Sequence, residues 1–194
     1  MLEEAVLDIA KKDIHANAGE EFRYSNYGMV IVARIAEVVT KKRFEQLMRT
    51  RIFVPLGMRN TSFVTDDGSA PNPANGAKST ATDYAKFLQM FMNGGEFNNV
   101  RILSRKTIEL MMTNQLHHTI DRQFGLGFGL ETTANDHSSI SSIGTFEWGG
   151  AFNTDFWADP KEKMIGLFYT NIYQSPAWDV TEKFKVLSYQ AVID

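Results

Sequence analysis

The spacing of apolar residues changes once along the chain, near residue 123, and this change limits the possible folds more than any other feature. Before it, apolar residues recur every three or four positions, as in amphipathic helices. After it, they alternate with polar residues and glycine, as in half-buried strands. Helices followed by consecutive strands predict an α+β fold with an antiparallel sheet. We expect a single domain over residues 1–194, mainly helical over about 1–122, with antiparallel strands and a C-terminal helix over about 123–194.

Five segments of the first part have helical spacing. They cover about residues 2–12, 27–40, 43–51, 80–93 and 104–114. The segment 27–40, "YGMVIVARIAEVVT", has few polar interruptions, so we expect it to be a buried helix. Ser25 or Asn26 is suited to cap it, because short polar side chains accept hydrogen bonds from the first free amides of a helix. Ser79 or Thr80, and then Ser104, are the corresponding caps of the last two helices.

Four later segments have the character of strands. They are "FGLGFGLE" (124–131), "SIGTFEWGG" (142–150), "FNTDFWADP" (152–160) and "KMIGLFYTN" (163–171). The run Asp159–Lys163 predicts a hairpin turn between the last two strands. Residues 177–192 follow as a final helix, with Val180, Phe184 and Leu187 among its apolar positions.

The composition excludes several classes of function. A net charge of −3 argues against non-specific nucleic-acid binding, which requires a basic surface. The absence of cysteine excludes disulfides, thiolate metal sites and a cysteine nucleophile. The histidines, which are His15, His117, His118 and His137, lack the spacing of metal ligands. No apolar stretch approaches the ~20 residues of a membrane span, and the acidic, amphipathic start does not have the pattern of a signal peptide.

Several separated motifs occur together in a fixed order. They are Tyr24-Ser25-Asn26 at the start of a helix, "PLGM" at 55–58, "TSF" at 61–63, "STATDYAKFLQMFMNGG" at 79–95 and "EWGGAFNTDFWADPKEKMIGLFYTN" at 147–171. On these motifs, residues 16–192 resemble the serine β-lactamase-like superfamily. The resemblance is greatest to the branch that contains class C β-lactamases, penicillin-binding carboxypeptidases and family VIII carboxylesterases.

This resemblance implies a fold and a set of site residues. The family fold joins an antiparallel sheet flanked by helices to an inserted helical region, and its nucleophile is the serine of a Ser-x-x-Lys motif. By resemblance, Tyr24 is the catalytic base and Asn26 orients the substrate carbonyl or the lysine. Trp148-Gly149-Gly150 stands where many relatives have Lys-Thr-Gly, and with Ala151 it implies a substrate-binding, oxyanion-stabilising edge. A tryptophan there favours an esterase, and no metal or cofactor is implied.

The Ser-x-x-Lys motif itself is missing from the sequence. No serine is followed by a lysine at the third position. We therefore expect the chain to be a truncated, C-terminal portion of the fold and to be inactive alone, since acyl transfer needs the nucleophile, the base and the oxyanion hole together. Without the family's lysines, Tyr24 is expected to stay a neutral phenol.

Simpler interpretations of these residues stay open. Tyr24 and Asn26 fit a helix-start turn, Trp148 fits core packing, and Ser25 lacks a nearby lysine or histidine that could activate it. The small-molecule partner implied by the family is an ester or a β-lactam-like compound. The alternative is a catalytically dead remnant that binds a ligand or self-associates. In the family the last strand pairs with the first one, so segment 164–170 is expected to form an open edge and a possible homo-oligomer contact.

Overall fold

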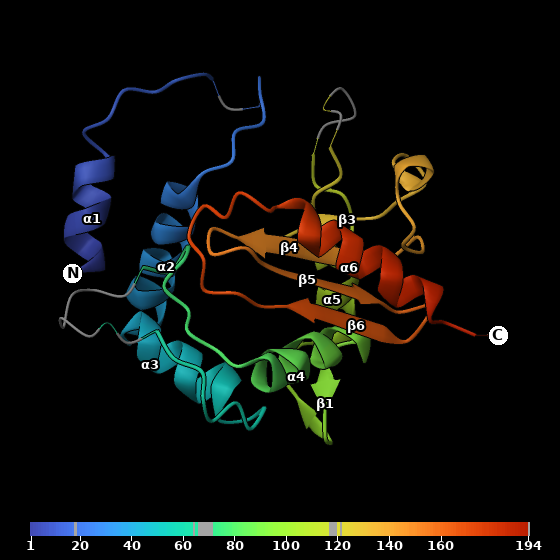
Figure 1. Cartoon of the computed structure of the whole chain (residues 1–194). Coiled ribbons are helices and arrows are strands. Elements are labelled where there is room, and N and C mark those ends of the chain that lie inside the picture. The colour runs from blue at the N-terminus through green and yellow to red at the C-terminus, as the bar shows by residue number, and fades with distance from the viewer. Residues whose placement is uncertain (18, 64, 66–71, 117–119, 121, 194) are drawn as a thin grey trace. The chain divides into compact units, whose positions relative to one another are not determined.

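The computed structural model describes residues 1–17, 19–63, 65, 72–116, 120 and 122–193 (Figure 1). The chain divides into two compact units, residues 1–86 and 87–194. The mixture of helices and antiparallel strands confirms the expected α+β class. The expectation of a single domain stays a prediction.

The first unit is helical. It contains α1 (Leu2–Ile9), α2 (Asn26–Thr40), α3 (Phe44–Met48), the π-helical turn η1 (Arg49–Phe53) and the start of α4 (Ala81–Met92). The second unit contains the rest of α4 and the strands. Its further elements are β1 (Glu96–Phe97), β2 (Val100–Arg101), α5 (Arg105–Met111), β3 (Gly129–Leu130), η2 (Asp136–Ser138), β4 (Phe146–Gly150), β5 (Thr154–Asp159), β6 (Met164–Phe168) and α6 (Asp179–Gln190).

Helix α2 begins as predicted but is not buried. The Ser25 hydroxyl accepts a hydrogen bond from the Gly28 amide at 3.2 Å, which confirms the predicted cap. Only Val30 and Ala33 of this helix are buried, in a cluster with Leu2 of α1. The prediction of a buried helix is therefore wrong. Within the first unit α2 packs against α1 and α3, which cover one side and leave the other side apolar and exposed.

The single helix expected over 43–51 changes its geometry halfway. It starts as α3 and continues as η1, where the Val54 amide bonds the Arg49 carbonyl at 2.9 Å, five residues back. The wider turn places Phe53, which is 7% exposed, against Phe63, with ring centroids 6.1 Å apart.

Helix α4 is anchored at its start by a buried carboxylate. The Thr80 side chain caps the helix by accepting from the Asp83 amide at 3.3 Å. Asp83 is 2% exposed and accepts from the Asn60 amide at 2.6 Å and from the Lys86 ammonium at 2.8 Å. Burial acts to raise the pKa of Asp83. The hydrogen bonds to its carboxylate and the charge of Lys86 outweigh burial and hold this pKa below its ordinary value.

The sheet of the second unit has the strand order β3-β4-β5-β6, with every neighbouring pair antiparallel (Figure 1). Strand β3 is much shorter than the predicted 124–131. Gly127 has a φ of 107°, and the Gly125 amide bonds the Phe128 carbonyl at 2.9 Å, so this glycine-rich segment turns before it can pair. The predicted hairpin turn after β5 is confirmed. There the Asp159 carboxylate, which is 0% exposed, accepts from the Lys161 and Glu162 amides.

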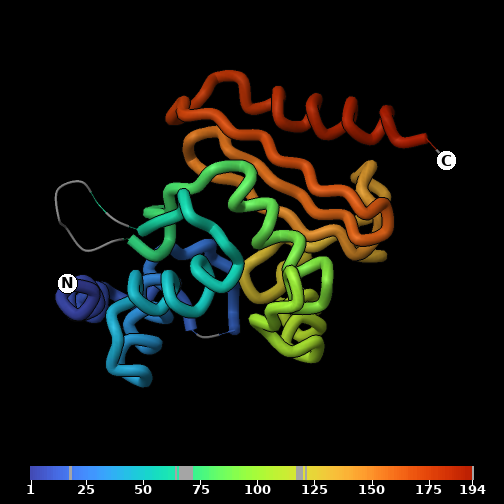
Figure 2. Tube along the Cα trace, turned by 90° about the horizontal axis from the view of Figure 1, so that it is seen from below, coloured from blue at the N-terminus to red at the C-terminus, as the bar shows by residue number. Residues whose placement is uncertain are grey.

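The two faces of this sheet are covered differently (Figure 2). One face carries an aromatic core, in which Phe128 and Phe146 of the sheet region lie 5.0 and 6.0 Å from Phe91 of α4, measured between ring centroids. Helix α6 covers the other face. Its buried side chains are Thr181 and Lys185 rather than the predicted apolar set, and Leu187 is 63% exposed.

The contact between α6 and the sheet centres on Trp157 of β5. Its ring centroid lies 5.7 Å from that of Phe184, and the side chain is 1% exposed. Trp157 lies opposite Gly166 of β6, and a Cβ added at Gly166 would approach the indole ring closer than 3.0 Å. Glycine at this position therefore makes room for the ring.

Candidate functional site

Tyr24 and Asn26 are neighbours at the start of α2, in the first unit. Tyr24 is 58% exposed, and Asn26, the first residue of the helix, is also exposed. Between them, the Ser25 hydroxyl accepts the hydrogen bond of the helix cap. The structure thus supports the helix-start role of this motif, and the catalytic role of Tyr24 and Asn26 stays a prediction.

The other four predicted residues lie together in the second unit. Trp148, Gly149 and Gly150 end strand β4, and Ala151 opens the turn to β5. A Cβ at Gly150 would approach the Thr154 hydroxyl closer than 3.0 Å, so a larger residue there would require the Thr154 side chain to move. Ala151 is exposed, and its carbonyl accepts a hydrogen bond from the Gln174 amide at 3.2 Å.

Trp148 both packs and lines a cavity. Its ring meets Phe124 edge to face at a centroid distance of 5.0 Å, and the Arg122 guanidinium lies 5.6 Å from its centroid. The side chain is half-buried. This arrangement fits the packing interpretation and leaves part of the ring open to a ligand.

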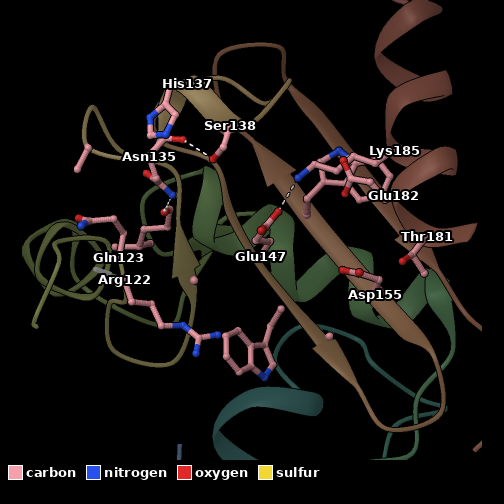
Figure 3. Close-up of a pocket in the computed structure, with 16 residues that line it drawn as sticks. Arg122, Gln123, Asn135, His137, Ser138, Glu147, Asp155, Thr181, Glu182 and Lys185 are labelled. Atoms are coloured by element: carbon pink, nitrogen blue, oxygen red, sulfur yellow. Dashed lines mark hydrogen bonds and ion pairs between the residues drawn. The ribbon is translucent and has the colours of Figure 1, made fainter. Parts of the chain in front are cut away.

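A cavity of about 490 Å³ lies on the α6 face of the second unit's sheet (Figure 3). Its floor is made by facing residues of β3, β4 and β5. Glu147 of β4 lies opposite Gly129 of β3 on one side and Trp157 of β5 on the other. Gly149 of β4 lies opposite Asp155 of β5. Figure 3 shows Thr181, Glu182 and Lys185 of α6 on one side, and Asn135, His137 and Ser138 on the other. Of the predicted residues, Trp148 and Gly149 line this cavity.

Carboxylates dominate the charge of the cavity floor. The Lys185 ammonium pairs with Glu147 at 2.6 Å, and the Lys185 side chain is only 10% exposed. Burial, followed by the neighbouring charge of Glu147, raises the pKa of Asp155 to about 6. Burial also raises the pKa of Glu131, which follows β3.

The described residues contain neither a metal-ligand cluster nor a membrane-spanning helix. In the part of the chain that the structure describes, no three histidine, aspartate or glutamate side chains are placed to hold a metal ion. No helix among these residues is long and apolar enough to cross a bilayer. His117 and His118 lie outside the described residues.

Sequence analysis did not identify this cavity, because its residues come from several separate segments. A signal was present in the strand alternation: Glu147 and Gly149 occupy alternate positions of β4, on the face opposite Phe146 and Trp148. The four-residue spacing of Thr181 and Lys185 also places both on one face of α6. Which of these faces meet could be seen only in the folded chain.

Comparison with known proteins identifies the family. The Beta-lactamase family model matches residues 2–190, so the chain belongs to the β-lactamase family. Among curated proteins, it is 34% identical over 112 residues to Protein Rv1367c of Mycobacterium tuberculosis, covering 50% of this chain and 28% of that protein. It is 27% identical over 154 residues to the 6-aminohexanoate-dimer hydrolase of Paenarthrobacter ureafaciens, covering 75% of this chain and 38% of that enzyme.

Solved structures show the same fold. The hydrolase EstCE1, described as having promiscuous acyltransferase activity, superposes with a TM-score of 0.84 at 20% identity, over 97% of this chain and 61% of that one. A penicillin-binding protein from Bacillus halodurans gives a TM-score of 0.74 at 19% identity, over 96% of this chain and 62% of that one. The predicted β-lactamase-like fold is confirmed. The chain spans 28–38% of the length of these curated relatives and about three fifths of these solved chains.

Proposed function

We propose that these residues are the C-terminal portion of a β-lactamase-like serine hydrolase that cleaves an ester or an amide, β-lactams included, through an acyl-serine. Membership of the family supports the reaction class. The observation that carries the proposal is the exposed Tyr24 held at the capped start of α2, where the family motif has its base. In the full protein, Tyr24 would take the proton of the nucleophilic serine and return it to the leaving group, and Asn26 would orient the substrate.

In this proposal the end of β4 forms the substrate edge. Gly149 and Gly150 let the substrate approach the backbone, and the Ala151 amide donates to the developing oxyanion. Trp148 replaces the lysine that β-lactamase-type relatives have at this strand, and its half-buried ring gives the edge an apolar surface. The replacement of the lysine and the apolar surface of the Trp148 ring both favour an esterase over a β-lactamase.

The chain alone is proposed to be inactive. None of its serines begins a Ser-x-x-Lys motif, so the base and the oxyanion edge have no nucleophile to act with. The test is intact-mass analysis after incubation with a fluorophosphonate probe and, separately, with penicillin. We expect no covalent adduct, with a known serine hydrolase as the positive control. Stoichiometric acylation at one serine would contradict the proposal.

Turnover assays test the role of Tyr24 separately. The chain is assayed with p-nitrophenyl butyrate and with a chromogenic cephalosporin, beside Tyr24→Phe and a matched control, Tyr173→Phe, at another exposed tyrosine. We expect background rates in all three. Turnover that only Tyr24→Phe abolishes would show that the chain is active by itself, and turnover unaffected by the substitution would indicate a contaminant.

A second candidate function is self-association of a catalytically dead remnant, and the position of β6 favours it. Among the described strands, β6 pairs with β5 on one side only and ends the sheet. Its side chains Ile165, Leu167 and Phe168 are half-buried. An apolar edge of this kind can recruit a second copy by strand pairing.

Light scattering tests this candidate. We expect the apparent mass to rise with concentration, and Met164→Lys at the start of β6 to shift the chain towards monomer, since lysine on an edge strand opposes pairing. Val100→Lys, on the short strand β2, is the control and should behave as the unmodified chain. A monomer that persists to roughly 100 µM, a concentration at which micromolar complexes are nearly saturated, would rule out this association.

A further inference from the structure

The sheet face under α6 holds three carboxylates. Glu147 lies on β4 and Asp155 on β5, and their facing partners place both on the floor of the cavity. Glu131 lies two residues beyond Gly129, and its amide still bonds the Thr145 carbonyl of the next strand at 2.8 Å. Because side chains two residues apart on a strand point to the same side, Glu131 belongs to this face as well.

A lysine of α6, Lys185, lies against this face of the sheet. Lys185 pairs with Glu147 at 2.6 Å, and its ammonium also lies 5.9 Å from the centroid of the Trp157 ring. Within the described residues, neither Asp155 nor Glu131 forms a salt bridge. Arg122 reaches the rim of the cavity, where its guanidinium lies over the Trp148 ring. The floor therefore has more negative than positive charge.

Glu131 is a third acidic residue of this face, outside the lining of the cavity. The residue is 8% exposed, and its Oε1 atom has no hydrogen-bond partner among the described residues. Buried carboxylate oxygens are nearly always paired in native proteins. Burial raises the pKa of Glu131 and so disfavours its charged form.

The cavity has room beside Asp155 and Glu147. Gly129 and Gly149 have no side chains to fill the space above the floor. A Cβ at Gly149 would lie 3.9 Å from Asp155 Oδ2, so the Asp155 carboxylate borders the space above this glycine. Diagonal neighbours on adjacent strands are about 7–8 Å apart at their Cα atoms. An ammonium group between Asp155 and Glu147 can donate to both carboxylates at about 2.8 Å.

We propose that this cavity binds a small organic cation through a protonated primary amine seated between Asp155 and Glu147. A primary ammonium group has three N–H donors, so it can donate hydrogen bonds to both carboxylates. The rest of the ligand lies over Gly149 and Gly129, in a cavity whose volume is within the range of small-molecule sites. This binding does not depend on the proposed acyl-serine reaction.

Calorimetric titration of the full chain tests the site. The probe is 1,4-diaminobutane, and 1,4-butanediol is the neutral compound of matching length. We expect the diamine to bind at least about tenfold more tightly than the diol, and Asp155→Asn to remove at least about tenfold of that affinity, which corresponds to one lost charge-assisted hydrogen bond. Glu109→Gln, at an exposed carboxylate of α5, makes the same charge change elsewhere and should leave the affinity within about twofold.

Gly149→Ala supplies a second, independent variant that fills space in the cavity and leaves its charge unchanged. Its methyl group meets neighbouring atoms only at 3.5 and 3.9 Å, so the sheet can accept it, and it occupies the floor beside Asp155. We expect this variant to bind the diamine at least about threefold more weakly than the unmodified chain does. Equal binding of diamine and diol, no diamine binding up to about 20 mM, or equal effects of the Asp155 and Glu109 variants would overturn the proposal. Asp155-dependent binding of magnesium chloride in place of the diamine would also overturn it and indicate a metal site.

Discussion

Replacing Gly166 by alanine should destabilise the second unit through a single contact. The added methyl group would approach the Trp157 indole closer than 3.0 Å, so either the ring or strand β6 must move. The ring has little freedom, because Trp157 is 1% exposed and Phe184 packs against it at 5.7 Å between centroids.

The expected loss of stability can be estimated from two unfavourable contributions and one favourable contribution. Overpacking a dense core costs about 1–3 kcal/mol. If the displaced indole exposes about 50 Å² of apolar surface, a further loss of about 1 kcal/mol follows. Alanine restricts the unfolded chain and returns about 0.4–1 kcal/mol. We therefore expect Gly166→Ala to lower the free energy of unfolding by about 1–3.5 kcal/mol, compared with the ~5–15 kcal/mol of a typical domain.

Urea denaturation followed by far-ultraviolet circular dichroism measures this loss without relying on tryptophan fluorescence. Gly149→Ala is the matched control, since it makes the same change in the same sheet with contacts no closer than 3.5 Å, and it should be neutral or slightly stabilising. The substitution is also made in a Trp157→Leu background, where the smaller side chain leaves room. There, Gly166→Ala should cost less than about 0.5 kcal/mol. An equal loss in both backgrounds, or none in the native one, would refute the steric explanation.

Three further substitutions test charges and hydrogen bonds. The folded pKa of Asp155, about 6, lies above its ordinary 3.8, so its contribution to stability is full below about pH 4 and is lost as the pH rises through 6. Asp155→Asn should therefore stabilise the chain by about 1–2 kcal/mol at pH 7.5, less than the ~3 kcal/mol of a fully buried group, and by nearly nothing at pH 4 in urea melts. Asp83→Ala should cost about 2–4 kcal/mol, because the Asn60 amide and Lys86 lose a buried acceptor, and an unchanged thermal midpoint would contradict this. Tyr189→Phe removes a 2.8 Å hydrogen bond to the Asp159 carboxylate and should cost about 1.5 kcal/mol in the same melts, whereas a loss below about 0.3 kcal/mol would show that the bond contributes nothing.

The local features of the fold could be predicted because they depend on short-range chemistry. The Ser25 cap, the hairpin turn at Asp159–Lys163 and the order of helices before strands follow from side chains and backbone preferences within a few residues. Strand β3 was predicted too long, because alternation alone does not show that Gly127 adopts a positive φ and turns the chain.

Burial was harder to predict, because it depends on which elements meet. The apolar pattern of α2 predicted a buried helix, yet Val32 is 60% exposed, since its neighbours in the first unit cover one side only. In α6, Thr181 and Lys185 are buried because they face the sheet beside Trp157 and Glu147. The predicted catalytic residues rest on the family motif, and the cavity under α6 depends on a register between strands that no single segment contains.

The position of α6 in the sequence also determines when its face of the sheet is closed during synthesis. Strands β4, β5 and β6 all precede α6, so on the ribosome they emerge before the helix that covers them. At about 5–20 residues per second, the stretch from the end of β6 to the end of α6 takes roughly one to four seconds to synthesise. For that time the Trp157 ring lacks its cover and Glu147 lacks its lysine. Closure of this face by α6 therefore comes after all three strands have been synthesised.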